Sequence, residues 1–118
     1  MIRIDNRYGT IEISQEYFRY LVGNAVSSCY GVVGMVRSGT RQGLRSVLTR
    51  RVHLDDGIRV RNEGVRLVVD IHIEVVFGMN ISAIAKSIVN KVRYTVEEAT
   101  GLTVKKVNVF VDGMKSEE

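Results

Sequence analysis

The clearest alternation of apolar and polar positions lies in the second half of the chain. Every odd position from 65 to 77 is apolar, and most of the even positions between them are polar; the apolar set is Val65, Leu67, Val69, Ile71, Ile73, Val75 and Phe77. A period of two is typical of a β-strand that turns one face to the core and the other to water. The pattern therefore predicts a long, half-buried strand over Val65–Phe77.

Shorter patterns on both sides of this strand predict a hairpin, a helix and a last strand. Residues 58–61 also alternate, and Asn62-Glu63-Gly64 is a turn sequence in which glycine can take positive φ. After Gly78, an N-cap at Asn80 opens an apolar stripe with helical spacing, which predicts a helix of about twenty residues ending at Gly101. Val107, Val109 and Val111 then alternate as a final strand.

The first half predicts one strand and one helix. The strand covers 10–13, and the helix covers about Gln15–Tyr30, with Ser14 as its N-cap and Gly31 as its stop. Residues 32–36 form a short apolar run that fits either a strand or the wall of a turn. From 37 to 56 the signal weakens, and the segment fits a glycine-containing loop, with one or two helical turns over 44–48 as the alternative.

These elements predict an α+β fold. Two amphipathic helices cover one face of a mixed sheet in a two-layer sandwich, in the order β-α-(β)-β-β-α-β. We expect residues 1–118 to form a single domain with an ordered core at about 9–113, an Arg-rich loop at 37–56 and a frayed tail at 114–118. The other sheet face stays uncovered, and its apolar side chains, Val68, Val76 and Phe110, are a candidate interaction surface.

Composition narrows the class of protein. The 118 residues are 45% hydrophobic, which is enough for one core, and no run of about 18 apolar residues is long enough to cross a membrane. The N-terminus lacks the apolar region of a signal peptide, so we expect a cytoplasmic protein. Cys29 is the single cysteine and excludes an internal disulfide; we expect it to be a small buried hydrophobic residue.

The net charge of +4 is concentrated in one segment. Residues 37–61 hold seven Arg and two Asp, a local charge of +5, so the rest of the chain carries −1. A candidate anion-binding loop consists of Arg37, Arg41, Arg45, Arg50 and Arg51. Such a loop binds nucleic acid, anionic lipid or an acidic partner, or is merely solvated. No aromatic ladder accompanies it, and the central residues of Gly31-Val32-Val33-Gly34 are apolar, unlike those of a KH-type loop.

Candidate catalytic chemistry is sparse. Asp70, His72 and Glu74 share the outer face of the long strand, but side chains about 6.7 Å apart on one strand run parallel and do not converge on one atom. A nucleophilic pair of Cys29 with His53 or His72 has no supporting motif. The chain also lacks a phosphate-binding loop, a dinucleotide-binding glycine pattern and a nucleophile elbow. We therefore predict no enzymatic activity, no catalytic residue, no metal and no cofactor.

Several segments carry a resemblance to a known family. They are Gly9-Thr10-Ile11-Glu12-Ile13-Ser14, Gly31-Val32-Val33-Gly34-Met35, Gly57-Ile58-Arg59-Val60, Phe77-Gly78 and Thr100-Gly101-Leu102-Thr103-Val104 with the strand that follows. On these segments the chain resembles the alkaline shock protein family of Gram-positive envelope stress response proteins. The resemblance implies a cytoplasmic, non-enzymatic protein of cell-envelope homeostasis. It also implies self-association and recruitment to the inner face of the membrane by an anchored partner.

Two functional hypotheses follow. The first is a protein-interaction module that binds a second copy or a membrane-anchored protein through a sheet edge or through the outer sheet face. The second is a nucleic-acid-binding module that uses the arginines between Arg37 and Arg51, with affinity that falls steeply as salt rises. A metal or hydrolase site at Asp70, His72 and Glu74 is the third and least favoured.

Overall fold

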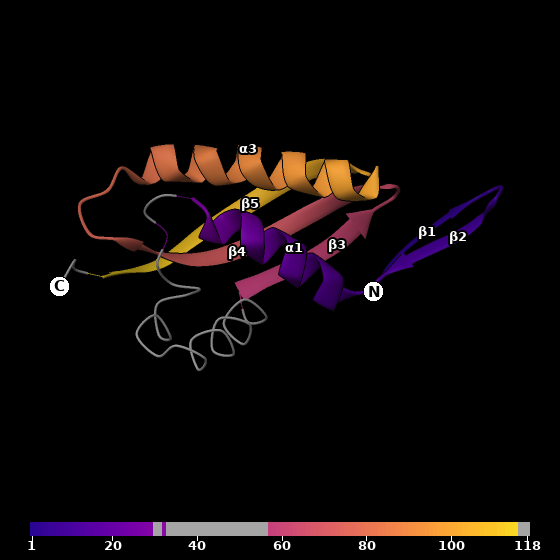
Figure 1. Ribbon diagram of the computed structural model, residues 1–118, viewed down its shortest axis with the longest axis horizontal. Coiled ribbons are helices and arrows are strands. Elements are labelled where there is room, and N and C mark those ends of the chain that lie inside the picture. The colour runs from indigo at the N-terminus through magenta and orange to yellow at the C-terminus, as the bar shows by residue number, and fades with distance from the viewer. Residues whose placement is uncertain (30–31, 33–56, 116–118) are drawn as a thin grey trace.

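The structure, a computed structural model, describes residues 1–29, 32 and 57–115. Five strands and two helices are described (Figure 1): β1 Ile2–Asn6, β2 Gly9–Ile13, α1 Gln15–Ser27, β3 Ile58–Glu63, β4 Arg66–Val76, α3 Ile81–Thr100 and β5 Thr103–Lys115. Of the predicted run over 32–36, only Val32 is described, and it forms an antiparallel β-bridge with Val75. The rest of that run, the alternative helical turns over 44–48 and the Arg-rich loop lie outside the described residues.

The main sheet has the strand order β3-β4-β5. Strand β4 runs antiparallel to β3 and parallel to β5, so the sheet is mixed, and α3 makes the crossover between the two parallel strands. Figure 1 shows α1 and α3 side by side over one face of this sheet. The predicted α+β sandwich with two helices on one face of a mixed sheet is therefore confirmed.

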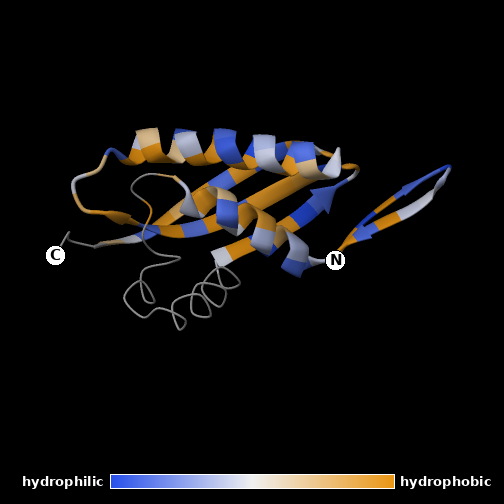
Figure 2. Cartoon of the chain, in the orientation of Figure 1, coloured by the Kyte–Doolittle hydropathy of each residue, from blue (hydrophilic) through white to orange (hydrophobic). Residues whose placement is uncertain are grey.

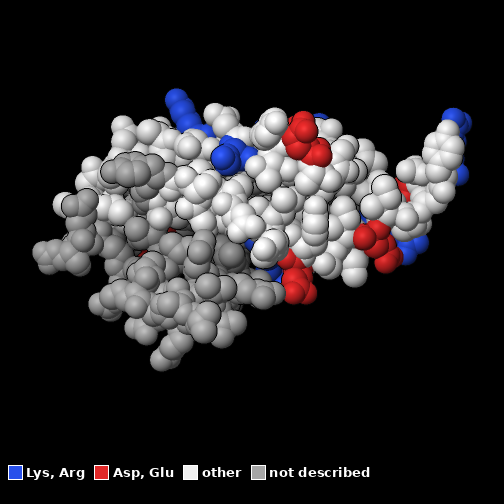
Figure 3. Space-filling view, viewed as in Figure 1, with Lys and Arg blue, Asp and Glu red and all other residues white. Residues whose placement is uncertain are grey.

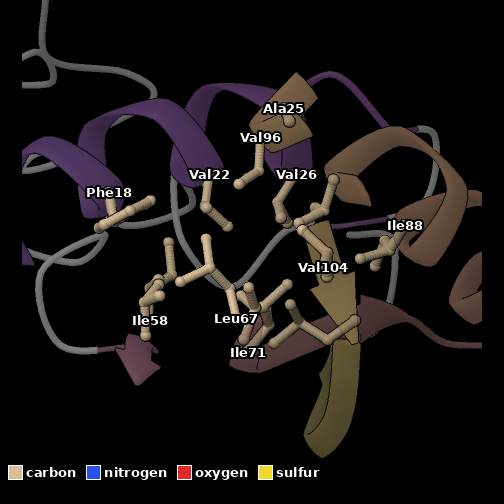
Figure 4. Close-up of a cluster of buried hydrophobic side chains, with 14 of the residues drawn as sticks. Phe18, Val22, Ala25, Val26, Ile58, Leu67, Ile71, Ile88, Val96 and Val104 are labelled. Carbon is tan, nitrogen blue, oxygen red and sulfur yellow. The ribbon is translucent and has the colours of Figure 1, made fainter. Parts of the chain in front are cut away.

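The core lies between the helices and the inner face of the sheet. Phe18 and Val22 of α1 point toward Leu67 and Ile71 of β4, while Ile88 approaches from α3 (Figure 4). All five side chains are fully buried. The odd positions from 67 to 75 in β4 are buried, as the alternation predicted. At about 1.5–3 kcal/mol for each buried aliphatic or aromatic side chain, this burial is the main force holding the helices on the sheet.

Three of the four helix ends follow the predicted capping residues, and the fourth, the predicted stop of α1 at Gly31, does not. Ser14 accepts a hydrogen bond at Oγ from the Tyr17 backbone N–H, and Asn80 accepts one at Oδ1 from the Ala83 N–H. Gly101 ends α3 at φ 74°, a left-handed conformation that glycine adopts without the Cβ clash of other residues.

Some predicted boundaries were wrong. Val65 and Phe77 lie outside β4 and are 64% and 67% exposed, because Val65 is in the turn after Gly64 and Phe77 follows the last paired residue. Helix α1 ends at Ser27, short of Tyr30. At the C-terminal end, β5 continues to Lys115, which is paired with Val76 of β4 although we expected residues from 114 to fray.

A second sheet at the N-terminus was not predicted. Strands β1 and β2 form an antiparallel hairpin that projects from the body of the domain (Figure 1). Figure 2 shows apolar residues in both strands of the hairpin. Ile2 pairs with Ile13 and Ile4 pairs with Ile11, so these four side chains share one side of it. The described fold therefore begins at Ile2, well before the predicted start of the ordered core at residue 9.

Candidate interaction surface

The outer face of the main sheet, opposite the helices, carries most of the side chains that the sequence singled out. On β4 this face consists of Arg66, Val68, Asp70, His72, Glu74 and Val76. The register places Val68 beside Lys106, Asp70 beside Asn108 and His72 beside Phe110 on β5. On the other side of β4, Arg61 lies beside Val68 and Arg59 beside Asp70. In the described part of the chain, both helices lie on the opposite face.

The centre of this face is a flat aromatic platform. The rings of His72 and Phe110 stack with centroids 4.6 Å apart and an interplanar angle of 17°. Phe110 is 44% exposed, and no element of the described residues covers it. His72 Nδ1 lies 2.9 Å from Asp112 Oδ2, so this carboxylate fixes the orientation of the imidazole ring. We call His72 and Phe110 the platform.

Asp70 has different partners from His72. The Asn108 side-chain amide donates to Asp70 Oδ1 over 2.8 Å, and Arg61 Nε lies 3.5 Å from Asp70 Oδ2. Asp70 and His72 are therefore held apart on neighbouring rows of the face. Among the described residues, no group of three His, Cys, Asp or Glu side chains is placed to hold a metal ion.

The expectation that Val68 offers exposed apolar surface to a partner was wrong. Val68 is on the outer face, yet it is fully buried. Its neighbours across the sheet, Arg61 and Lys106, have long aliphatic stems of the kind that cover an apolar side chain while their charged ends stay in water. Val76 is partly buried at the end of β4, so Phe110 is the most exposed of the three candidate side chains.

The end of the face near the β3–β4 turn is rich in basic side chains. Lys105 Nζ donates to Glu63 Oε1 over 2.8 Å, and an Arg61 guanidinium nitrogen lies 3.3 Å from Glu63 Oε2. The hydrogen bond from Lys105, together with its charge, lowers the pKa of the Glu63 carboxyl below its ordinary value. Lys106 and Arg66 lie close by on the same face.

Side chains from the helices form hydrogen bonds with backbone groups of the two outer strands of the sheet. Gln15, the first residue of α1, donates from Nε2 to the Val60 carbonyl and accepts at Oε1 from the Val60 N–H over 3.1 Å. On β5, Glu97 accepts from the Val104 N–H over 2.8 Å, and Arg93 donates to the Val104 carbonyl. These contacts block strand addition at Val60 and Val104.

Several of these contacts were not predicted from the sequence. Gln15, Arg93 and Glu97 look like ordinary helix-surface residues, and only the packing of helix on sheet brings them to strand edges. The position of Asp112 on the outer face could have been predicted, because Asp112 shares the even parity of Asn108 and Phe110 in the last strand. The five arginines of the candidate anion-binding loop, as well as His53, lie outside the described residues, so their predicted roles stay predictions.

The described helices also carry exposed aromatic side chains, Tyr17, Tyr20 and Tyr94, but none of them forms a stacked ring pair like that of His72 and Phe110. Figure 3 shows the Lys, Arg, Asp and Glu side chains of the helix-covered face scattered, with no large patch of either sign among the described residues. The Cys29 thiol is buried and lies 3.5 Å from the Ala25 carbonyl, as expected of a small core residue. Across the described segments, no helix has the length and hydrophobicity needed to span a membrane.

The described residues thus define a class: a small α+β domain in which two helices cover one face of a mixed sheet and leave an aromatic platform on the other. The chain belongs to the alkaline shock protein family, described as the ASP23 family with a cell envelope-related function, whose model matches residues 3–116. The predicted family is therefore confirmed.

Relatives of similar length support this membership. The chain is 37% identical to the uncharacterised protein YloU of Bacillus subtilis, over 97% of this chain and 95% of that protein. It is 30% identical to the uncharacterised protein Spy1614 of Streptococcus pyogenes, over 97% and 94%. A structure of the MamM CTD is 16% identical with a TM-score of 0.46, covering 87% of this chain and 86% of that one, which is too distant to bear on function.

Proposed function

We propose that this protein is a non-enzymatic interaction module of the cell envelope that associates with itself and is recruited to the membrane by an anchored protein. The family description, a cell envelope-related function, supports the setting. The candidate interaction surface supports the mode of action, because a sheet face that no described element covers, with an exposed aromatic side chain, is suited to binding another protein.

The observation that carries the proposal is the platform. Phe110 is 44% exposed and is held flat against His72, which is itself oriented by Asp112. Large aromatic side chains on rigid elements are enriched among residues that dominate binding energy at interfaces. A β-strand holds such a side chain with little conformational freedom, so less entropy is lost when a partner covers it.

The test is sedimentation velocity of the full chain and of the variant Phe110→Asp over a wide concentration range. We expect the parent protein to associate and the variant to shift toward monomer, because the substitution places a charge in the contact. Tyr94→Asp is the matched control: Tyr94 is 66% exposed on α3, on the helix-covered side, and its loss should leave association unchanged.

Circular dichroism melts of both variants check that the fold is retained. A parent protein that sediments as a monomer at every concentration, or a Phe110→Asp variant that associates as well as the parent, would contradict the proposed self-association. Affinity capture from the membrane fraction with parent and variant side by side tests the recruitment. An anchored partner that needs the platform is retained by the parent and by Tyr94→Asp, and lost with Phe110→Asp.

A further inference from the structure

We infer that the partner which covers the outer face is a second copy of this chain, packed face to face with its strands antiparallel to those of the first. This inference rests on the proposed function, because it names the occupant of the same surface. It is carried by the way charge changes along the strands of the candidate interaction surface.

Charge on the face is separated along the strand direction. Toward the β3–β4 turn, Arg61 and Lys106 flank buried Val68. Arg66 and Lys105 add two further positive charges there, against the single carboxylate of Glu63, which is already paired with Lys105 and Arg61. Toward the other end, beyond the platform, the face holds Glu74 and Asp112. Lys106 makes no ion pair within the described residues, and the Asp112 side chain is 57% exposed. A basic end and an acidic end on one face are complementary to the same face turned by 180°.

One position of the symmetry axis brings opposite charges together. Ile71 and Val109 are paired neighbours on β4 and β5. A two-fold axis that crosses the strands at this row exchanges positions 106 and 112 on β5, and positions 70 and 72 on β4. Lys106 then faces Asp112 of the second copy, and Asp70 faces His72 of the second copy. Each contact occurs twice, as in any two-fold interface.

The alternative face-to-face arrangement places like charges together. A two-fold axis along β4 would set Asp70 against Asp70 of the second copy, and Arg61 against Lys106 of the second copy. Like charges placed opposite each other are destabilising. The charge pattern therefore favours the antiparallel arrangement over the parallel one.

The strand edges are less suitable contacts for a second copy. Gln15 holds both backbone groups of Val60 on β3, and Arg93 with Glu97 hold those of Val104 on β5. A strand added at either edge must displace these side chains at those positions. Face-to-face packing leaves all of these hydrogen bonds in place.

The size of the face predicts a weak dimer. With this axis, β4 and β5 each face the same strand of the second copy, whereas β3 pairs only with residues 66–71 of β4 and faces no described strand. Eleven residues of β4 extend about 36 Å at ~3.3 Å per residue, and two strands ~4.8 Å apart are about 10 Å wide. The contact therefore covers roughly 350 Å² per copy, or about 700 Å² in total, well below the ~1,200 Å² of a standard stable interface. We expect association that weakens as salt rises, since exposed charge pairs contribute to it.

The test uses charge reversal at the predicted pair. Lys106→Glu alone and Asp112→Lys alone each turn both symmetric attractions into repulsions, and we expect each variant to associate about tenfold more weakly than the parent. An equimolar mixture of the two variants should recover association as a heterodimer, because the glutamate of one copy then faces the lysine of the other. Lys86→Glu on the exposed side of α3 is the control and should behave as the parent.

The outcomes of sedimentation equilibrium separate this inference from the proposed function. Recovery in the mixture supports the antiparallel contact, and misfolded variants would not complement each other. If the parent protein associates and both single variants associate equally well, this interface is overturned, but self-association still stands. The same conclusion follows if the single variants associate more weakly and their mixture does not recover association. A parent protein that stays monomeric overturns both.

Discussion

The contact between Gln15 and Val60 predicts that Gln15→Glu lowers the stability of the protein. Helix electrostatics alone would predict that the same substitution raises it. Gln15 is the first residue of α1, where an acidic side chain interacts favourably with the helix dipole by about 0.3–1 kcal/mol. Considered alone, the helix predicts that Gln15→Glu stabilises the protein. The structure predicts the opposite, because the glutamine amide donates to the Val60 carbonyl while its oxygen accepts from the Val60 N–H.

A carboxylate at position 15 accepts but cannot donate. Gln15→Glu therefore loses one hydrogen bond of about 0.5–1.5 kcal/mol and turns a negative charge toward a carbonyl oxygen. The favourable dipole contribution offsets most of the lost hydrogen bond, so the repulsion between the carboxylate and the Val60 carbonyl decides the sign. We expect the variant to be less stable than the parent at pH 7, by up to about 1 kcal/mol. Gln15→Ala loses both hydrogen bonds and should cost about 1–3 kcal/mol.

Urea unfolding followed by far-UV circular dichroism measures these differences, since the chain has no Trp to serve as a fluorescent probe. Glu16→Gln is the control: Glu16 is exposed in the same helical turn, so this variant reports the dipole contribution alone. A Gln15→Glu variant that is as stable as the parent, or more stable, would refute the account of Gln15 as a clamp on the edge of β3.

Two further predictions concern the outer face. Val68→Asp should unfold the domain or lower its midpoint of urea unfolding sharply, since a charge would replace a fully buried side chain. Phe110 is exposed, so Phe110→Asp should change the midpoint little. Equal midpoints for the two variants would show that Val68 is accessible. The lowered pKa of Glu63 requires Lys105, so Lys105→Met should return the carboxyl toward its ordinary pKa in an NMR titration. A carboxyl with a lowered folded pKa contributes stability above its unfolded pKa, and that contribution is lost as pH falls through the folded value. The parent should therefore lose more stability than Lys105→Met when the pH falls below the ordinary pKa of Glu, and an equal loss would count against the Lys105 contact.

The sequence predicted those parts of the fold that depend on short-range patterns. The alternation in β4, the caps at Ser14 and Asn80, and the stop at Gly101 all concern residues within a few positions of each other. It failed where the ends of an element are set by pairing with a distant strand, as at Val65.

The hairpin β1–β2 was missed for a different reason. Residues 2–6 alternate over only a few positions, with Ile2 and Ile4 as the apolar members. The strand exists because β2 pairs along its whole length, with Ile4 opposite Ile11. A run of this length predicts nothing firm until its partner strand is known.

For the candidate interaction surface, too, the sequence predicted what depends on nearby positions and missed what depends on distant strands. Parity along the strand correctly assigned Val68, Asp70 and His72 to the outer face, because side chains on a strand alternate strictly. Parity says nothing about exposure, which depends on the neighbours across the sheet. Val68 is buried between strands that carry Arg61 and Lys106, while Phe110 is exposed although it lies only two rows away.

The sequence left open whether a partner would bind at a sheet edge or on the outer face, and the packing of the helices favours the face. A short open sheet has two unpaired edges, which invite uncontrolled strand addition unless they are protected. Here, side chains from α1 and α3 hold the backbone groups of Val60 and Val104. Contact through the face depends instead on side chains such as Phe110, Lys106 and Asp112, whose spacing and charge differ from one β-sheet protein to the next. Strand addition uses backbone groups that all β-sheets share, so a partner that binds the face can be selected by sequence in a way that an added strand cannot.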